Sequence, residues 1–188
     1  AELSASPSRV AVSGQYAYAL HYTTSQSGRG FQILDISAPT PVVKSTVSLS
    51  ETAYSIAQSG RYVYIGYPTN KIQVFDVSDV AHPALVNVGV NQATSLSANN
   101  PIDMVAAGTY LYTISPTADF EIFDVSTPSN ARRIGYVKMT GSAALKAIAL
   151  SGHYAFLLGE ADDAINVVDI ANPSVPKIVH TVPLYSSI

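Results

Sequence analysis

Two short motifs recur four times along the chain in the same order, and this repetition constrains the fold more than any other feature. The first motif is a glycine followed two and four residues later by aromatic side chains, at residues 14–18, 60–64, 108–112 and 152–156. The second is an apolar stretch around an aspartate, at residues 31–37, 72–78, 120–126 and 165–171. The glycines are spaced by 46, 48 and 44 residues and the aspartates by 41, 48 and 45. The chain is therefore built from four copies of one unit.

Each unit contains four runs that read as β-strands. In the first unit these are residues 9–13, 16–20, 31–36 and 42–49, which are rich in Val, Ile, Tyr and Phe and are bounded by Gly, Pro and Ser. The Ser-Gly or Ala-Gly pair between the first two runs predicts a tight hairpin, because glycine supplies the positive φ of a two-residue turn. Residues 146–150 resemble a helix locally, but their alignment with residues 8–12 predicts a strand.

The second run of each unit is apolar on both faces, as Tyr16 and Tyr18 on one side and Ala17 and Ala19 on the other illustrate. A sheet of this kind needs a neighbouring sheet on each side. The prediction is an all-β fold, a β-propeller of four four-stranded antiparallel blades. The ring is either closed with four blades or part of a larger ring or assembly. The 188 residues form one domain, 1–188, with blades at approximately 6–52, 53–100, 101–144 and 145–188.

The second motif also resembles that of a known family, the LVIVD repeat. The resemblance rests on two runs that are each followed by a nearby proline, Gln32-Ile33-Leu34-Asp35-Ile36-Ser37 and Gln73-Val74-Phe75-Asp76-Val77-Ser78. It implies a propeller of bacterial or archaeal proteins that are often exported or attached to the cell surface, with no common catalytic activity. Such proteins usually carry more than four repeats. A short member, a piece of a longer one, and a ring completed by association all remain open.

The composition limits the classes of partner and the cellular locations that are expected for this chain. Lys and Arg number ten and the net charge is −3, so no basic patch for nucleic acid is expected. No apolar run approaches the length of a membrane span, and the first residues lack the charged start and apolar stretch of a signal peptide. Cysteine is absent, which excludes disulfides. Twelve Tyr and few Lys favour an extracellular or cell-surface location.

Residues that recur in every unit are interpreted as structural. The motif aspartates precede a turn, where a carboxylate accepts backbone N–H groups, and the hairpin glycines set the first turn. These residues are Asp35, Asp76, Asp124, Asp169, Gly14, Gly60, Gly108 and Gly152. The aromatic residues of the second strand are interpreted as packing.

The units differ in two connections, and function is expected there. From glycine to aspartate there are 21, 16, 16 and 17 residues, and from aspartate to the next glycine 25, 32 and 28. The extra residues fall in the loop 21–30 and the link 90–102. In an antiparallel blade these connections emerge on one face, which is the predicted binding face. The candidate binding residues on it are Arg9, His21, Tyr22, Arg29 and Asp103, with Arg9 facing Asp103 if the ring closes with four blades.

Cofactor and enzyme signals are weak. Glu160, Asp162 and Asp163 cluster in the last loop and are calcium candidates, although their spacing matches no known calcium loop. No other cofactor is predicted. The chain lacks a Walker loop, a Gly-x-Ser-x-Gly elbow and a His-Glu-x-x-His motif. No catalytic residue is assigned, and the protein is interpreted as more a binder than an enzyme.

Three functions remain in view. The first is a non-enzymatic binding or scaffold propeller that presents one face to a protein, a glycan or a like subunit. The second is a self-assembling subunit, as a ring-completing dimer or an extracellular fibre, because an open array of blades exposes apolar sheet faces. The third is a hydrolase or lyase with carboxylates such as Asp103 and Glu160 at the channel mouth.

Overall fold

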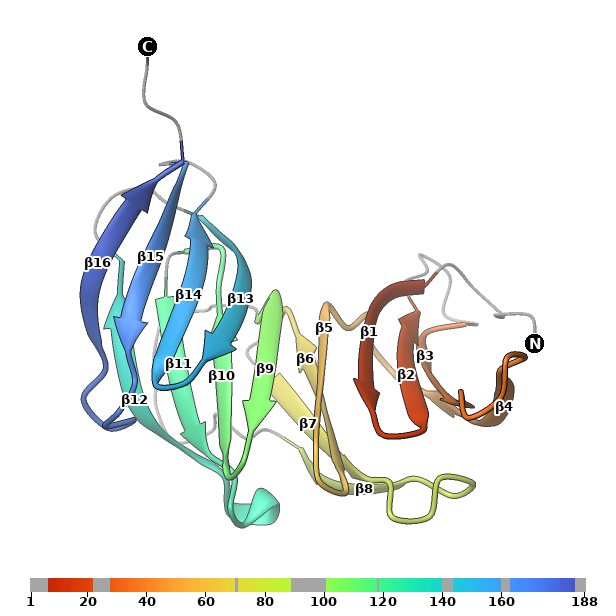
Figure 1. Cartoon of the computed structure of the whole chain (residues 1–188). Coiled ribbons are helices and arrows are strands. Elements are labelled where there is room, and N and C mark those ends of the chain that lie inside the picture. The colour runs from red at the N-terminus through yellow and green to blue at the C-terminus, as the bar shows by residue number, and fades with distance from the viewer. Residues whose placement is uncertain are drawn as a thin grey trace.

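The fold is seen in a computed structural model, which describes residues 7–21, 28–69, 71–88, 101–117, 119–139, 144–159 and 163–184. Four four-stranded antiparallel sheets follow one another along the chain (Figure 1). We call them blades 1 to 4. Blade 1 holds β1 (Pro7–Ser13), β2 (Tyr16–His21), β3 (Gly30–Asp35) and β4 (Val42–Ser48). Blade 2 holds β5 (Ser55–Ser59), β6 (Tyr62–Tyr67), β7 (Lys71–Asp76) and β8 (Ala84–Val88).

Blade 3 holds β9 (Asp103–Ala107), β10 (Tyr110–Ile114), β11 (Asp119–Asp124), the 3-10 turn η1 (Pro128–Asn130) and β12 (Arg132–Lys138). Blade 4 holds β13 (Leu145–Ser151), β14 (Tyr154–Gly159), β15 (Ala164–Asp169) and β16 (Lys177–Pro183). Within each blade the strands pair in chain order. Residues 146–150 lie in a strand, as the repeat alignment predicts.

The two repeated motifs form the turns of every blade. The hairpin glycines have φ between 54° and 59°, and a Cβ at each would meet no atom within 4 Å. The motif aspartates each accept the backbone N–H of the residue two positions on, at 2.9–3.0 Å. The serine hydroxyl at this position and then the N–H bond lower the pKa of Asp35 and Asp124, and the N–H bond is the larger cause for Asp76. The recurrence of these residues therefore has a local conformational cause.

The outer strand of every blade carries an irregularity that sequence analysis does not foresee. The register between the third and fourth strands shifts next to Leu34, Phe75, Phe123 and Val168. Each shift leaves one extra residue in the outer strand, which is the signature of a β-bulge. A bulge increases the local twist, and it lies at the same place in all four copies.

Apolar side chains pack between consecutive blades. One core cluster joins blades 1 and 2 around Phe31, Ile33, Ile56 and Ile65. A second joins blades 2 and 3, and a third joins blades 3 and 4. No such cluster joins blade 4 to blade 1 among the described residues. The blades form an open arc with blades 1 and 4 at its ends, which confirms the propeller-type all-β prediction in its open form (Figure 1).

Among the described residues, no helix has the length and apolar character needed to span a bilayer.

The close approach of blades 3 and 4 yields a stability prediction. A Cβ at Gly135 of β12 would clash with the backbone carbonyl of Pro173, and with Pro176 Cδ at 3.2 Å. Gly135→Ala is expected to lower the free energy of unfolding by about 1–3 kcal/mol, the usual effect of overpacking. Urea denaturation measures the effect. Gly152→Asn is the control, because this glycine has open space around it and Asn tolerates a positive φ. An unchanged midpoint for Gly135→Ala contradicts the close approach.

Candidate functional site

The described ends of the connections that vary in length lie on one side of the arc, which we call the loop face. It consists of the loops between the second and third strands and the links between blades. Backbone bonds hold residues of the links there, from Leu49 N–H to Arg29 O in the first loop (3.0 Å), and from Tyr54 N–H to Gly66 O (2.8 Å) and Ile102 N–H to Ile114 O (3.1 Å) in second strands. The hairpins with the positive-φ glycines lie at the opposite edge (Figure 1).

The first strands of the blades, β1, β5, β9 and β13, run side by side along the inner side of the arc. Their starts reach the loop face. Four residues take equivalent places there, as the partners opposite them in the second strands show: Arg9, Ser55, Asp103 and Ala147 pair with Leu20, Gly66, Ile114 and Leu158. We call these four residues the inner column.

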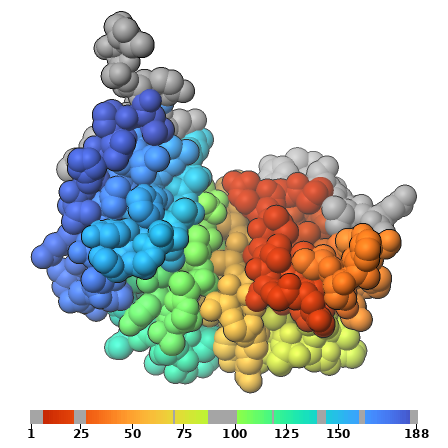
Figure 2. Space-filling view, in the orientation of Figure 1, coloured from red at the N-terminus to blue at the C-terminus, as the bar shows by residue number. Residues whose placement is uncertain are grey.

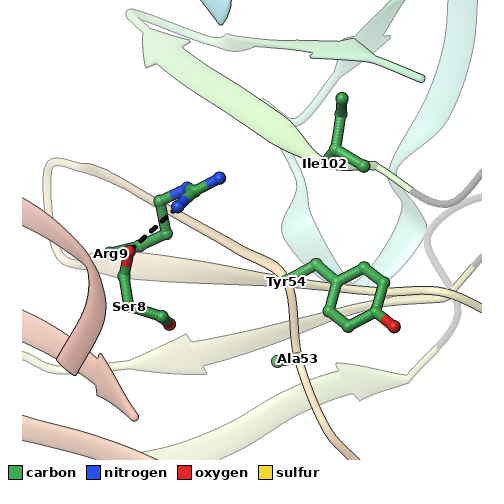
Figure 3. Close-up of a pocket in the computed structure, with 5 residues that line it drawn as sticks. All are labelled: Ser8, Arg9, Ala53, Tyr54 and Ile102. Carbon is green, nitrogen blue, oxygen red and sulfur yellow. Dashed lines mark hydrogen bonds between the residues drawn. The ribbon is translucent and has the colours of Figure 1, made fainter. Parts of the chain in front are cut away.

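Arg9 of the inner column lies in a pocket of about 200 Å³ between blades 1, 2 and 3. The other lining residues are Ser8, Ala53, Tyr54 and Ile102. Figure 3 shows the Arg9 side chain extending from β1 toward the space between Tyr54 and Ile102. Its only hydrogen bond drawn there is to the carbonyl of Ser8, at 2.9 Å. None of the ion pairs among the described residues involves Arg9.

A second hollow of about 210 Å³ continues from Arg9 along the inner strands. It is lined by residues of β1, β5 and β9, among them Val10, Gln58 and Asp103. The structure therefore places Arg9 and Asp103 in one hollow, although the blades do not close into the four-bladed ring on which their pairing was predicted. We call the pocket and this hollow together the Arg9 groove.

Asp103 holds two blades together. Its carboxylate accepts the N–H of Met104 at 3.0 Å and the N–H of Ile148, in blade 4, at 3.1 Å. Burial raises the pKa of Asp103, although both N–H groups and the nearby Arg9 act in the opposite direction. Ser55 makes the equivalent contact one blade earlier, donating to the carbonyl of Pro101. Two of the four inner-column residues thus connect neighbouring blades, a role that no pattern within a single repeat indicates.

The other predicted binding residues flank the first loop. His21 is 2% exposed, and neither ring nitrogen has a hydrogen-bond partner among the described residues. The Arg29 carbonyl accepts the N–H of Leu49, and its Nε is buried without a partner. Tyr22 lies outside the described residues. The structure does not bring His21 and Arg29 into the Arg9 groove, whose lining includes neither residue.

The calcium prediction concerns a loop that is described only in part. Glu160 and Asp162 lie outside the described residues. Asp163 has a φ of 43°, and its carbonyl accepts the N–H of Leu184 at 2.7 Å. No group of three or more His, Asp or Glu side chains gathers in the described part of the chain. Calcium binding at this loop stays a prediction.

Blade 3 contains a buried carboxylate that the sequence patterns do not indicate. Asp119 has no exposed surface and accepts hydrogen bonds from Thr117 (2.7 Å) and Tyr136 (2.5 Å), with Lys138 at 3.6 Å. Burial alone would raise the pKa of Asp119, but these donors and the Lys138 charge outweigh it and leave the pKa lowered. The repeat alignment hides this site, because the equivalent residues are Gly30, Lys71 and Ala164.

Comparisons with known proteins identify the repeat and the fold. The LVIVD repeat profile matches residues 6–48, 51–88 and 141–183. These segments lie in blades 1, 2 and 4, so blade 3 is recognised by its two sequence motifs and by its structure but not by the profile. No curated protein sequence matches the chain.

Solved structures with a similar fold share little sequence with this chain. A protein from Lactobacillus plantarum superposes with a TM-score of 0.78 at 16% identity over 96% of this chain and 57% of its own. A putative 6-phosphogluconolactonase from Bacteroides uniformis gives 0.74 at 15% identity, over 92% and 55%. A chain in the complex of KlAtg21 with a coiled coil of AgAtg16 gives 0.68 at 15% identity, over 94% and 57%. The chain spans little more than half the length of these proteins.

The contact of Asp103 with blade 4 predicts a loss of stability on truncation. Asp103→Ala removes the acceptor for the Ile148 N–H and is expected to lower the free energy of unfolding at pH 7 by about 1–3 kcal/mol. Asp103→Asn keeps an acceptor oxygen and should lose less. Urea unfolding of both variants provides the measurement, and equal stability of wild type and Asp103→Ala contradicts the role of Asp103.

The Asp119 site predicts a pH dependence. Because its pKa is lowered in the folded state, its contribution to stability is present above the ordinary carboxyl pKa and is lost as the pH falls through the folded value. Tyr136→Phe removes one donor to Asp119, so the free energy of unfolding at pH 7 should fall by about 1–3 kcal/mol. Below the ordinary carboxyl pKa, the free energy of unfolding of this variant should depend less on pH than that of the wild type. Thermal unfolding between pH 3 and 7 tests this. Tyr154→Phe is the matched control, and identical pH profiles for wild type and Tyr136→Phe refute the prediction.

Proposed function

The chain belongs to the LVIVD repeat family. From the geometry of the Arg9 groove we propose that it is a non-enzymatic binding and scaffold propeller that holds a segment of a partner protein. The observation that carries this proposal is the position of Arg9, whose guanidinium lies without an ion-pair partner among the described residues, in a pocket with Tyr54 and Ile102. The preferred segment carries a carboxylate next to an apolar side chain.

Three properties of the groove support a protein ligand. Arg and Tyr are the residue types that dominate binding energy at protein interfaces, and Tyr54 is 36% exposed. A guanidinium also binds a carboxylate through two parallel hydrogen bonds, which favours an acidic side chain over a neutral sugar. The groove walls are strands tied together by Asp103 and Ser55, so binding requires little ordering of the protein.

The non-enzymatic part of the proposal rests on Asp103. The hydrolase alternative needs this carboxylate for acid or base chemistry, but its oxygens accept backbone N–H groups of two blades. The other carboxylate of that alternative, Glu160, lies outside the described residues. One similar structure is a propeller in a protein complex, which is consistent with a binding role but shows only the fold at 15% identity. The tyrosine-rich, lysine-poor composition supports placing this function outside the cell or at its surface.

A displayed library of random peptides tests the proposal. Selection on the full chain should enrich peptides in which an acidic residue adjoins an apolar one. Arg9→Gln should weaken binding of a selected peptide at least about tenfold in fluorescence anisotropy, and added salt should weaken it further. The control is Lys44→Gln, which removes a cation from the exposed outer strand β4. Peptides that bind wild type and Arg9→Gln equally, or selection without enrichment, would refute the Arg9 groove as the site.

A further inference from the structure

Each blade has two packing faces, and the arc leaves one of them uncovered at each end. We call the face toward the following blade the forward face and the face toward the preceding blade the rear face. In blade 4 the forward face carries Phe156, Leu158, Ile165 and Val167, because the neighbouring positions in β14 and β15 pack on blade 3. In blade 1 the rear face carries Val10, Val12, Ala17 and Leu34, because Tyr18, Leu20 and Ile33 pack on blade 2.

The exposure of equivalent residues shows that the rear face of blade 1 lacks a partner. Val10 is 64% exposed, whereas Ile56, Met104 and Ile148 at the same place in blades 2, 3 and 4 are 6%, 3% and 8% exposed. Val12, two residues on, is 61% exposed. The Val10 position is apolar in all four blades and is buried wherever another blade precedes it. Val10 is therefore an apolar junction residue that has no neighbouring blade, and the exposed Val12 extends the apolar surface beside it.

The forward face of blade 4 also lacks a neighbouring blade. Phe31, Ile72 and Phe120 of the third strands are at most 1% exposed, whereas the equivalent Ile165 is half-buried. A pocket of about 220 Å³ opens on this face, lined by Ala147, Ile148, Ala149, Phe156, Leu158 and Ile165. An apolar hollow of this kind fits protruding side chains such as Val10 and Val12.

The outer strands add a polar contact that the ends could reproduce. The outer-strand residue before the bulge shift is Ser45 in blade 1, Gly135 in blade 3 and His180 in blade 4. Ser45 donates to the carbonyl of Val80 in blade 2 at 2.7 Å, and Gly135 approaches the carbonyl of Pro173 in blade 4. Val80 and Pro173 each follow their motif aspartate by four residues. His180 is exposed, and the equivalent carbonyl of blade 1 belongs to Pro39, which is also exposed.

We infer that a second copy of this chain covers both ends, with the forward face of blade 4 of each copy packed on the rear face of blade 1 of the other. The partner is a second copy because each vacant face has the chemistry of the three junctions already present in the chain. One copy aligns with 55–57% of each similar chain, so it supplies little more than half of such a fold. The twofold arrangement creates two identical junctions and leaves no sheet face free. The gap between blades 1 and 4 is visible in Figure 2.

In the junction between copies, Val10 and Val12 enter the hollow at Phe156 and Leu158, as Ile56 and Ile148 enter the preceding blades. His180 of one copy donates to the Pro39 carbonyl of the other, in the manner of Ser45 and Val80. The pocket around Arg9 lies between blades 1, 2 and 3 of one copy and contains no residue of this junction, whereas Val10 also lines the hollow that continues from that pocket.

Sedimentation velocity of the full chain, from low to high micromolar concentration, tests the inference. The expected result is a mass of two chains that falls to one on dilution. Val10→Glu and Leu158→Glu each place a carboxylate in the junction and should raise the dissociation constant at least about tenfold. Leu85→Glu is the control, because Leu85 is a 50% exposed side chain on the outer strand β8 of a middle blade. Circular dichroism verifies that every variant folds.

Mixing the two junction variants identifies which faces meet. Val10→Glu keeps an intact forward face and Leu158→Glu keeps an intact rear face, so one junction can still form between them. The mixture should therefore sediment as two chains at concentrations where each variant alone sediments as one. A wild-type mass of one chain at every concentration overturns the inference, and so does a mass that grows beyond two chains. Dimerisation of Val10→Glu alone with wild-type affinity would overturn the pairing of unlike faces.

Discussion

The structure depends on one constraint, which is that each small sheet must bury apolar side chains on both of its faces. A four-stranded sheet with Phe31 and Ile33 on one side and Ala17 and Leu34 on the other gains little stability in isolation, because one layer cannot remove both faces from water. Stacking of the blades removes every internal apolar face from water. The three core clusters accordingly lie between blades rather than within them. The same constraint singles out the two ends of the arc, where Val10 and Ile165 keep the apolar character of buried positions without a neighbour.

Polar groups determine how the blades meet at the inner side of the arc. Asp103 and Ser55 carry hydrogen bonds from one blade to the next at the start of the inner strands. Arg9 takes the equivalent position in blade 1 but bonds only to the neighbouring carbonyl of Ser8, and its charge remains directed into a pocket. The proposed binding site thus lies at the one charged residue of the inner column, Arg9, that does not bond to the next blade. Asp103 and Ser55 use their polar atoms to connect blades, whereas the charge of Arg9 is available for a ligand.

Much of this protein could be predicted from its repeats. The strand runs, the hairpin glycines and the aspartate turns follow from local preferences that act within a few residues, and the structure has them where the repeats indicate. Comparison of unit lengths also indicated the face that carries the variable connections. The site was predicted less completely. Arg9 and Asp103 were selected as a pair across a closed four-bladed ring, whereas they share a hollow of an open arc in which Asp103 joins blades. Tyr54 and Asp119 were missed, because neither belongs to a repeated column of like residues.

The sequence by itself determined the repeating unit, its four strands, its turns and the requirement that each sheet be covered on both sides, because these follow from glycine conformation, side-chain alternation and apolar patterning along short stretches. The tertiary structure decided the rest. It placed Arg9 beside Tyr54 and Ile102, buried Asp119 among Thr117 and Tyr136, and left the arc open between blades 1 and 4. These features depend on the angle and distance at which one blade meets the next. That geometry comes from side chains packed between units far apart in the chain, and no motif within a unit records it.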